Sequence, residues 1–336
     1  MKSGRPLLVH LALVAVAGVF AILMWTRDKQ PKALAAGDVT VWSGRPSDVE
    51  RISYEGKNKK LVLEPKKDAA GTYLIGTFEK QATAAKAPDA GADAAPPSPT
   101  ATTVSFVSVG AGQKLLEAMA PLKVLRSIGR IADDRAAEFG LAEPEGTILL
   151  KSGGTERKMI VGGATPGGSD RYVKDPASGE VYVLKGDIFR DLDTPDQRLV
   201  ERDLHEWKEA DVAKATVTAG GKKRELVRGS SEGKKFWADP QSADKNDETA
   251  GNWMSKLDRL RPTEFSMTPP EGKEVVARVD YQDAGRALGF LELVKVPGTG
   301  SAKADYYVLS ERTRNYAKVA ANQAEQVEQD VGAIAK

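Results

Sequence analysis

The chain contains no cysteine and only two histidines, His10 and His205, among its 336 residues. The missing thiols exclude disulfide bonds, thiol catalysis, cysteine-ligated zinc, iron–sulfur clusters and attachment through a lipidated cysteine. Two histidines cannot build a histidine-rich metal site. The Gly-x-Ser-x-Gly match at 229–233, GSSEG, lies between two predicted strands rather than at a strand-to-helix turn, so it is not interpreted as a nucleophile elbow. We therefore predict no catalytic residues, no cofactor and no metal ligands.

The chain also lacks an excess of either charge, with 49 Lys and Arg against 47 Asp and Glu. Nucleic-acid binding normally requires a basic stripe that displaces counterions from phosphates. The basic runs here, at 57–60, 221–224 and 233–235, are short and lie beside turn residues. We interpret them as solvated hairpin ends and expect no nucleic-acid partner.

One long apolar run is present, at the N-terminus. Residues 7–25, LLVHLALVAVAGVFAILMW, carry no formal charge when His10 is neutral, and a charged cluster at 27–29 ends the run. A helix of this length rises roughly 28 Å, close to the thickness of the hydrocarbon core of a bilayer. The sequence predicts a transmembrane anchor over residues 1–29 and a linker over 30–40.

A cleaved signal peptide is the alternative, because ALAAG at 33–37 offers small residues of the cleavage-site kind. A signal core is normally about 7–15 residues long, and these small residues lie well beyond the charged cluster. The flanking charges do not set the orientation, because both ends carry them about equally. We expect a retained single-pass anchor in the bacterial inner membrane with the bulk of the chain extracytoplasmic, as is common for one N-terminal span.

Two stretches of the chain share a pattern. VWSGRPSDVERISYEG at 41–56 and EWKEADVAKATVTAGG at 206–221 each place a tryptophan before an Asp-Val pair and an alternating run. Further alternating runs follow, as in an antiparallel meander, then a polar insert, a helix and more strands. The sequence predicts an α+β fold of two similar antiparallel-sheet-plus-helix units formed by internal duplication. Two unrelated domains with coincidentally placed tryptophans are the alternative.

We place the first unit at residues 41–203 and the second at 204–336. The first contains an Ala- and Pro-rich insert at 80–103 without an apolar period, which predicts a disordered surface loop. The predicted helices lie near 111–120, 187–202, 249–260 and 313–332. The predicted strands lie at 49–56, 59–65, 71–76, 146–153, 157–163, 170–175, 180–186, 213–220, 223–229, 234–239, 274–282, 286–296 and 305–311.

Three stretches carry residues that suggest chemistry. IVGGATPGGSDRYV at 160–173 is glycine-rich, but no lysine follows and a strand comes next, so a hairpin is favoured over a phosphate loop. SVGAGQKLLEAM at 108–119 lacks the full spacing of a nucleotide fingerprint and is interpreted as a helix start. DIFRDLDTPDQ at 187–197 does not match the calcium-loop spacing, so its aspartates are interpreted as helix caps and solvated carboxylates.

His205 lies at the junction of the two units, just before Trp207. We expect it to be structural or exposed rather than catalytic, since nothing nearby in the sequence supplies a nucleophile. We expect Trp42 and Trp207 each to pack over the start of its own meander, with stacking on a sugar or a partner as the alternative.

Several motifs resemble those of a known family. They are the N-terminal apolar run, TVWSGRPSDVERISYEGKNKKLVLEP from residue 40, FGLAEP at 139–144, and the VGG…RYV…VYVL series at 161–184. Together they resemble a bacterial domain-of-unknown-function family, number 4340, of membrane-anchored proteins. The resemblance is best over 42–200 and weaker in the second unit.

Members of this family are often encoded beside gliding-motility-type ABC transport components, so the resemblance implies an accessory extracytoplasmic subunit. Gly140, Leu141 and Pro144 correspond to the family's Gly-Leu…Pro turn, and Tyr172 and Tyr182 to its paired Tyr-Val strands. The resemblance implies no catalytic residue. The long Ala/Pro insert departs from the family's shorter loop.

We therefore expect a non-enzymatic scaffold that docks onto an ABC-type transport or gliding-motility-like envelope complex, with its sheet edges as docking surfaces. Two alternatives from other classes stay open. One is an extracytoplasmic ligand- or glycan-binding module that uses Trp207, Trp237, Tyr306 and Tyr307. The other is a hydrolase that relies on carboxylates alone.

Overall fold

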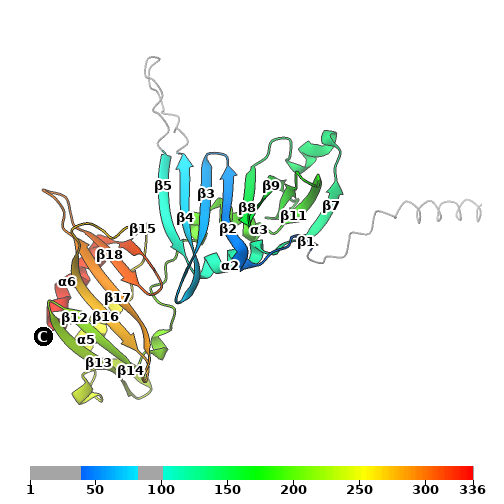
Figure 1. The fold of residues 1–336 in the computed structure, drawn as a ribbon. Helices are drawn as coiled ribbons and strands as arrows, with labels where there is room; N and C mark the ends of the chain where they lie inside the picture. The colour runs from blue at the N-terminus through cyan, green and yellow to red at the C-terminus, as the bar shows by residue number, and fades with distance from the viewer. Residues whose placement is uncertain (1–38, 82–100, 336) are drawn as a thin grey trace, which may run out of the picture.

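A computed structural model describes residues 39–81 and 101–335 of the chain. Two large antiparallel sheets follow one another along the chain, the first within residues 49–184 and the second within 214–319 (Figure 1). Few helices accompany them, so the fold is α+β as predicted. No helix within the described residues is both long and apolar enough to cross a membrane. The anchor predicted over residues 1–29 lies outside the described residues.

The first sheet has nine strands, in the order β5-β4-β3-β2-β8-β9-β10-β11-β7. The bounds are β2 (Val49–Gly56), β3 (Lys59–Asp68), β4 (Gly71–Gln81), β5 (Ala101–Ser108), β7 (Arg126–Arg130), β8 (Gly146–Ser152), β9 (Thr155–Ala164), β10 (Arg171–Lys174) and β11 (Glu180–Leu184). A two-stranded sheet of β1 (Val39–Trp42) and β6 (Leu122–Val124) lies beside it, with helices α2 (Gly110–Met119), α3 (Gly186–Asp193) and α4 (Pro195–Arg198). Alternate residues of β3, Leu61 and Leu63, are fully buried, which is the period-2 pattern that the sequence shows.

The second sheet has eight strands, in the order β14-β13-β12-β16-β17-β18-β19-β15. The bounds are β12 (Lys214–Ala219), β13 (Lys222–Ser231), β14 (Lys234–Ala238), β15 (Glu264–Ser266), β16 (Glu274–Gln282), β17 (Ala287–Val296), β18 (Asp305–Ser310) and β19 (Tyr316–Val319), with helices α5 (Glu248–Leu257) and α6 (Ala321–Ile334). With β5 left aside, the two orders correspond strand for strand.

The repeated sequence pattern marks the entry to each sheet. Short 3-10 turns, η1 (Pro46–Asp48) and η3 (Glu209–Asp211), stand directly before the first meander of each unit. The valine after each turn is buried, so it anchors the strand that follows. Trp42 lies on β1 and is buried, whereas Trp207 lies in the segment before η3 and is partly buried.

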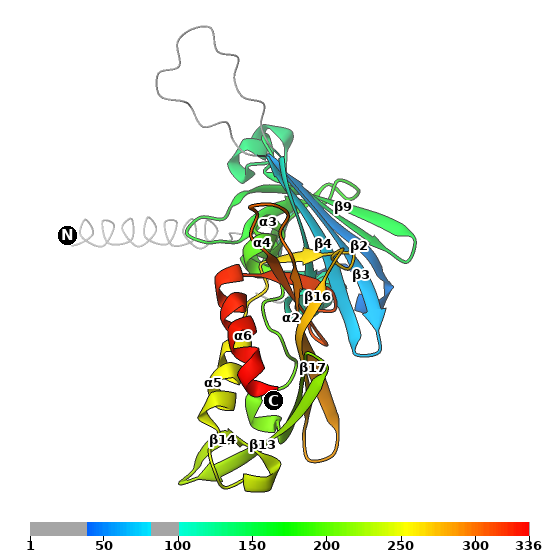
Figure 2. The same ribbon diagram turned by 90° about the vertical axis from the view of Figure 1, so that its left-hand side faces the viewer.

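Helices α5 and α6 lie together over one face of the second sheet (Figure 2). The indole of Trp253 is fully buried between them, and its Nε1 donates to the carbonyl of Val327 at 3.0 Å. Lys256 and Asp330 form an ion pair at 2.6 Å at the same helix pair. Most buried apolar residues of both units belong to one connected core cluster.

The structure corrects two of the predicted helices. The helix predicted over 313–332 begins only at Ala321, because residues 316–319 form β19 with alternating burial. The helix predicted near 187–202 is split at Thr194, where Pro195 removes a backbone donor and starts α4. Thr194 does not cap α4 with its side chain; its hydroxyl donates to the carbonyl of Arg190 at 3.0 Å.

The predicted insert at 80–103 is shorter than expected at both ends. Strand β4 continues to Gln81 and β5 starts at Ala101, and residues 82–100 between them lie outside the described residues. The strands β1, β5, β6, β7, β15 and β19 were not among the predicted elements. Five of them lie at a sheet edge or in the separate two-stranded sheet, where a short or polar strand shows little periodicity in the sequence.

A buried carboxylate ties the two units together. Glu201, in the linker after α4, is 7% exposed and forms an ion pair at 3.1 Å with Arg312, which lies in the turn between β18 and β19. Its other oxygen accepts the backbone N–H groups of Arg202 and Asp203, both at 3.1 Å. The backbone N–H of Glu201 donates to the carbonyl of Val107 on β5 at 2.8 Å. The linker is thus bonded to both sheets.

The same turn makes further ion pairs with the linker and with the first sheet. Arg314 lies 2.7 Å from Asp68 of β3 and 2.9 Å from Glu206. His205 Nδ1 lies 3.0 Å from Glu311. We call this set of pairs, which joins residues 311–314 to residues 201–206 and to Asp68, the linker ladder. It holds the second sheet against the first at the end where β15 lies beside β5 (Figure 1).

Candidate functional site

The two glycine-rich stretches are structural, as the sequence predicted. Residues 160–173 contain the end of β9, a turn and the start of β10, which pair as an antiparallel hairpin. Residues 108–119 end β5 and form α2, and the N–H of Gly110 donates to Glu201 at 3.4 Å. The first stretch leads into a strand, and the second leads into α2 without the glycine spacing of a nucleotide-binding loop.

The aspartates at 187–197 are largely neutralised by basic side chains. Arg198 lies 2.5 Å from Asp191 and 3.8 Å from Asp187, and Asp187 also pairs with Arg190. Asp193 pairs with Lys59 at 2.8 Å. The described residues contain no group of three or more acidic or histidine side chains that could hold a metal ion. The expectation that the protein takes no metal stays a prediction.

The aromatic residues of the ligand-binding alternative do not come together. Trp237 and Tyr306 are buried, at 4% and 2% exposure, on β14 and β18, which are separated by four strands of the sheet. The hydroxyl of Tyr306 bonds to Glu328 of α6, and burial raises its pKa to about 12. Trp207 stacks on His205 at 4.0 Å between ring centroids. A shared aromatic platform is therefore not formed by these residues.

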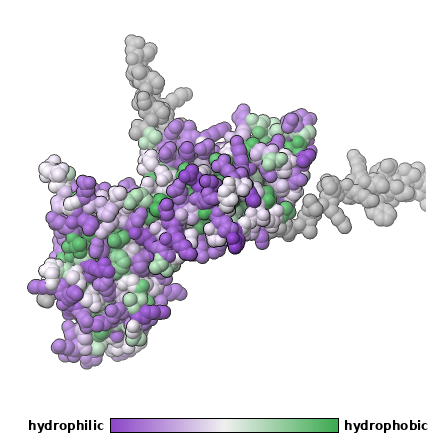
Figure 3. All heavy atoms as spheres, in the orientation of Figure 1, coloured by the Kyte–Doolittle hydropathy of each residue, from purple (hydrophilic) through white to green (hydrophobic). Residues whose placement is uncertain are grey.

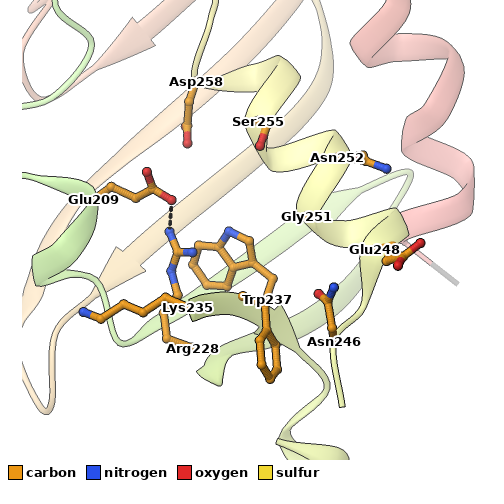
Figure 4. A pocket seen from close by; sticks show the side chains of 11 residues that line it. Glu209, Arg228, Lys235, Trp237, Asn246, Glu248, Gly251, Asn252, Ser255 and Asp258 are labelled. Atoms are coloured by element: carbon orange, nitrogen blue, oxygen red, sulfur yellow. Dashed lines mark hydrogen bonds and ion pairs between the residues drawn. The ribbon is translucent and has the colours of Figure 1, made fainter. Parts of the chain in front are cut away.

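A cavity of about 440 Å³ opens between α5 and the strands β13 and β14 of the second unit. We call it the α5 pocket; Figure 4 shows its lining. The lining side chains come from η3, β13, β14, the segment before α5, and α5 itself, and are Glu209, Arg228, Lys235, Phe236, Trp237, Asn246, Glu248, Asn252, Ser255 and Asp258, with Gly251 beside them. Its volume lies within the range of small-molecule and side-chain sites.

The floor of the α5 pocket is a stacked cation and indole. Arg228 on β13 and Trp237 on β14 are cross-strand neighbours, and the guanidinium lies 4.0 Å from the indole centroid. The side chain of Arg228 is 11% exposed and bonds to Glu209 of η3 at 2.5 Å. Its Nε is buried without a hydrogen-bond partner. The cation is thus held in place by its aromatic neighbour and one carboxylate.

Asp258 supplies the most unusual group of the pocket. It follows the last turn of α5, and its carboxylate points with the Ser255 hydroxyl toward Arg228 and Trp237 (Figure 4). Its closest hydrogen-bond contact is the Tyr281 hydroxyl, at 3.4 Å. Burial raises the pKa of Asp258 above its ordinary value of 3.8, and the charge of Glu209 adds to this rise. No lysine or arginine of the described residues forms an ion pair with it.

The residues behind the pocket are also short of partners. Tyr281 is fully buried, and burial raises the pKa of its hydroxyl well above the ordinary value, with the charge of Asp258 adding to it. The His205 ring packs edge-on against Tyr281 at 4.9 Å, and its Nε2 has no hydrogen-bond partner. Trp207 Nε1 is unpaired too. Unsatisfied buried polar groups are rare, and two of the six among the described residues lie here behind Asp258.

The pocket depends on the N-terminal cap of α5. Asp247 accepts the N–H of Ala250 at 2.9 Å and pairs with Arg224 at 2.6 Å. Burial alone would raise the pKa of Asp247, but these bonds lower it below 3.8. We expect Asp247→Ala to lower the free energy of unfolding by about 1–2 kcal/mol at neutral pH. The stabilising ionised form is lost as the pH falls through the lowered pKa, so the difference between the variants shrinks below about pH 4.

Thermal unfolding of Asp247→Ala and the original chain across pH 2–7 measures this effect. Asp244→Ala, in the same loop, is the control because Asp244 is exposed and makes no cap. Equal destabilisation at pH 7 and well below pH 3 would contradict the assigned cap.

A second cavity, of about 470 Å³, lies between α2 and α3 in the first unit. Ala118, Pro121 and Ile188 form its apolar part, and charged residues of both signs surround it. Its aspartates, Asp187 and Asp191, are the ones that arginines neutralise. This cavity offers an apolar surface but no uncommitted buried group. The visible face of the molecule is otherwise mostly hydrophilic, with small scattered apolar spots (Figure 3).

The motifs that carried the resemblance meet in the first sheet. Gly140 has φ +66°, and a Cβ there would lie 2.4 Å from the backbone nitrogen of Gly163 on β9. A Cβ on Gly162 would lie 2.4 Å from the carbonyl oxygen of Phe139. The ring of Phe139 packs edge-on against Tyr172 at 4.9 Å. The FGLAEP turn therefore docks on the glycine pair of β9 through direct backbone contact.

The paired tyrosine strands form the neighbouring hairpin. β10 and β11 pair with Tyr172 opposite Val183 and Val173 opposite Tyr182. Tyr172, Val181 and Val183 form a small second core, against which Phe139 and other partly buried apolar residues pack. The turn, the glycine pair and the tyrosine hairpin are thus one packing unit.

Comparison with known proteins gives a family match and no closer relative. The family described as Domain of unknown function (DUF4340) matches residues 111–278. No curated protein and no solved structure matches the chain. The match includes the FGLAEP turn, the tyrosine hairpin and the whole α5 pocket, but not the opening stretch at 41–56, where we expected a strong resemblance. Because the match spans half of the 336 residues, the chain belongs to the family described as Domain of unknown function (DUF4340).

Proposed function

We propose that the protein is a non-enzymatic, membrane-anchored extracytoplasmic scaffold that docks onto a larger envelope complex, of the ABC-type transport or gliding-motility-like class. The linker ladder is the observation that supports this proposal most. Three ion pairs, one of them to the buried carboxylate of Glu201, and the contact of His205 with Glu311 hold the two sheets in one arrangement, which suits a platform that presents a fixed surface. The predicted apolar anchor at 1–29 places that platform at the bacterial inner membrane.

We further propose that the two units arose by internal duplication. The strand orders correspond from β4 to β7 and from β14 to β15, and a 3-10 turn with an Asp-Val pair precedes the first meander in both. Two unrelated domains would have to share eight strands in one order and a helix at the same point of the chain. A docking scaffold gains a second, diverged surface from such a duplication.

Protein copurification tests the docking role. The full chain with its anchor is extracted from native membranes in mild detergent, and the proteins retained with it are identified. We expect ABC-type membrane subunits to be retained, because a docking scaffold stays with its complex. A chain that always leaves the membrane alone would contradict the proposal.

Exposure to protease tests the placement. In intact spheroplasts, added protease is expected to digest the two sheet units, because they lie outside the inner membrane in this proposal. Detergent-lysed spheroplasts serve as the control for intrinsic cleavability. Full protection in intact spheroplasts together with cleavage after lysis would place the units in the cytoplasm instead.

A ligand-binding module is the second candidate function, and the α5 pocket favours it. The pocket combines an aromatic floor, neutral amides and a carboxylate without a basic partner, which is a composition that selects polar ligands. The hydrolase alternative needs two carboxylates on opposite sides of a scissile bond. Glu209 and Asp258 line the same cavity, but Glu209 is paired with Arg228. Copurification as an unaccompanied monomer would favour these two candidates.

A further inference from the structure

The sheet edges offer little room for an added partner strand. The carbonyl of Val107 on β5 is taken by Glu201, and that of Trp237 on β14 by the N–H of Asp247, both at 2.8 Å. β7 has no register partner for Ile128 and a positive φ of 88° at Gly129, which bend the edge. β15 has only three residues. Short, partly covered or bulged edges disfavour the addition of a partner strand. These edges therefore favour a docking contact made by side chains.

The charged side chains of the α5 pocket differ in whether they already have a bonding partner. Its two basic residues already have partners, since Arg228 bonds to Glu209 and Lys235 Nζ donates to the carbonyl of Ala210 at 3.2 Å. The ammonium of Lys235 also points away from the cavity (Figure 4). Asp258 faces the cavity without a basic partner. The pocket therefore presents the Asp258 carboxylate as a hydrogen-bond acceptor, while both of its basic side chains already have partners.

The position of Asp258 strengthens its attraction for a cation that enters the pocket. The carboxylate is partly buried beside an indole and a tyrosine, so a charge paired with it there is poorly screened by water. The Ser255 hydroxyl projects beside it from the preceding turn of α5, and Asn252 and Glu248 lie at the rim (Figure 4). These groups supply further acceptors around one entering donor group.

We propose that the α5 pocket receives a lysine or arginine side chain of a partner protein, whose charge pairs with Asp258. This inference rests on the proposed docking function and names the chemistry of the contact. An aromatic floor, a partly buried carboxylate and a rim of polar acceptors form the arrangement of a binding hot spot for one long basic side chain.

A peptide library tests the proposal without knowledge of the partner. Phage-displayed heptapeptides are selected on the full chain held in a mild detergent. The enriched peptides are expected to share a lysine or arginine at one position. The synthetic peptide should bind Asp258→Asn about 10–100-fold more weakly than the original chain, and replacement of its basic residue by norleucine should have the same effect.

Two further variants control the measurement. Asp244→Asn makes the same chemical change on an exposed carboxylate outside the lining and should leave the affinity within about twofold. Ser255→Phe fills the cavity without changing its charge and should abolish binding of the same peptide. Selected peptides without a common basic residue, or equal binding to Asp258→Asn, would overturn the proposal. The copurification result does not depend on this outcome, so the two proposals fail separately.

The pH dependence separates binding from a structural role. Asp258 faces Tyr281 of β16, His205 of the linker, Glu209 of η3 and Arg228 of β13. Because burial favours its protonated form, basic peptides should bind more weakly as the pH falls through its raised pKa. The ionised carboxylate opposes folding at neutral pH, so Asp258→Asn should raise the unfolding temperature there while it loses the peptide. A lower unfolding temperature would show a structural role instead.

Discussion

Replacement of Gly140 by alanine is expected to destabilise the protein by about 3 kcal/mol. Two costs add at this position. The backbone has φ +66°, a left-handed conformation that costs a non-glycine residue about 1–2 kcal/mol. The new Cβ would also lie 2.4 Å from the Gly163 nitrogen and 2.7 Å from its Cα, and backbone atoms of a central strand cannot move aside.

Gly167→Ala separates the two costs. Gly167 has φ +72° in the turn between β9 and β10, but a Cβ there meets no atom within 4 Å. Its substitution should cost only about 1 kcal/mol, from the backbone conformation alone. Urea unfolding of both variants measures the difference, which is the cost of separating the FGLAEP turn from β9. Equal losses in the two variants would show that this turn does not dock on the strand.

The strands that the sequence predicted are apolar runs bounded by clear turn residues. Strand β2 has the predicted bounds, 49–56, and β16 the predicted bounds, 274–282. The sequence predicts a helix where the structure has the short strand β19, because Tyr316 and Val319 also fit the i, i+3 spacing of an apolar helix face. These residues form a strand because they pair with β18 and β15, and that pairing depends on segments that are distant in the sequence.

Strand β5 had a local signal that the composition of its neighbours hid. Thr102, Thr103 and Val104 are β-branched and favour a strand, but they directly follow the Ala/Pro-rich insert. The predicted boundary at residue 103 therefore cut through the strand. The insert itself, apart from its ends, lies outside the described residues.

The α5 pocket could not be predicted in the same way. Its residues come from a 3-10 turn, two strands and a helix spread over 209–258, and no short motif joins them. Asp258 in particular follows an apolar helix face and has the sequence context of an ordinary C-terminal cap. Only the packing of α5 across β13 and β14 brings it over Arg228 and Trp237 (Figure 4). The pattern of apolar residues fixes that packing but carries no information about which polar residue the cavity encloses.

The linker ladder gives the second large prediction. Glu201→Gln is expected to lower the free energy of unfolding by about 3 kcal/mol, because it leaves the guanidinium of Arg312 without its counter-charge in a mostly buried site. The amide keeps the size of the side chain and can still accept the N–H groups of Arg202 and Asp203. The variant therefore isolates the charge from the packing of the linker.

Glu206→Gln is the matched control, since it makes the same change in the same linker. Glu206 is 37% exposed, and its partner Arg314 keeps Asp68 at 2.7 Å, so the loss should stay below about 1 kcal/mol. Differential scanning calorimetry measures the unfolding transitions of both variants. The original chain should unfold in one transition, because its two units share a connected core and the ladder, whereas Glu201→Gln should separate the transitions of the two units. A single transition with equal losses in both variants would show that the ladder does not couple the sheets, and the platform on which the docking proposal depends would lose its main support.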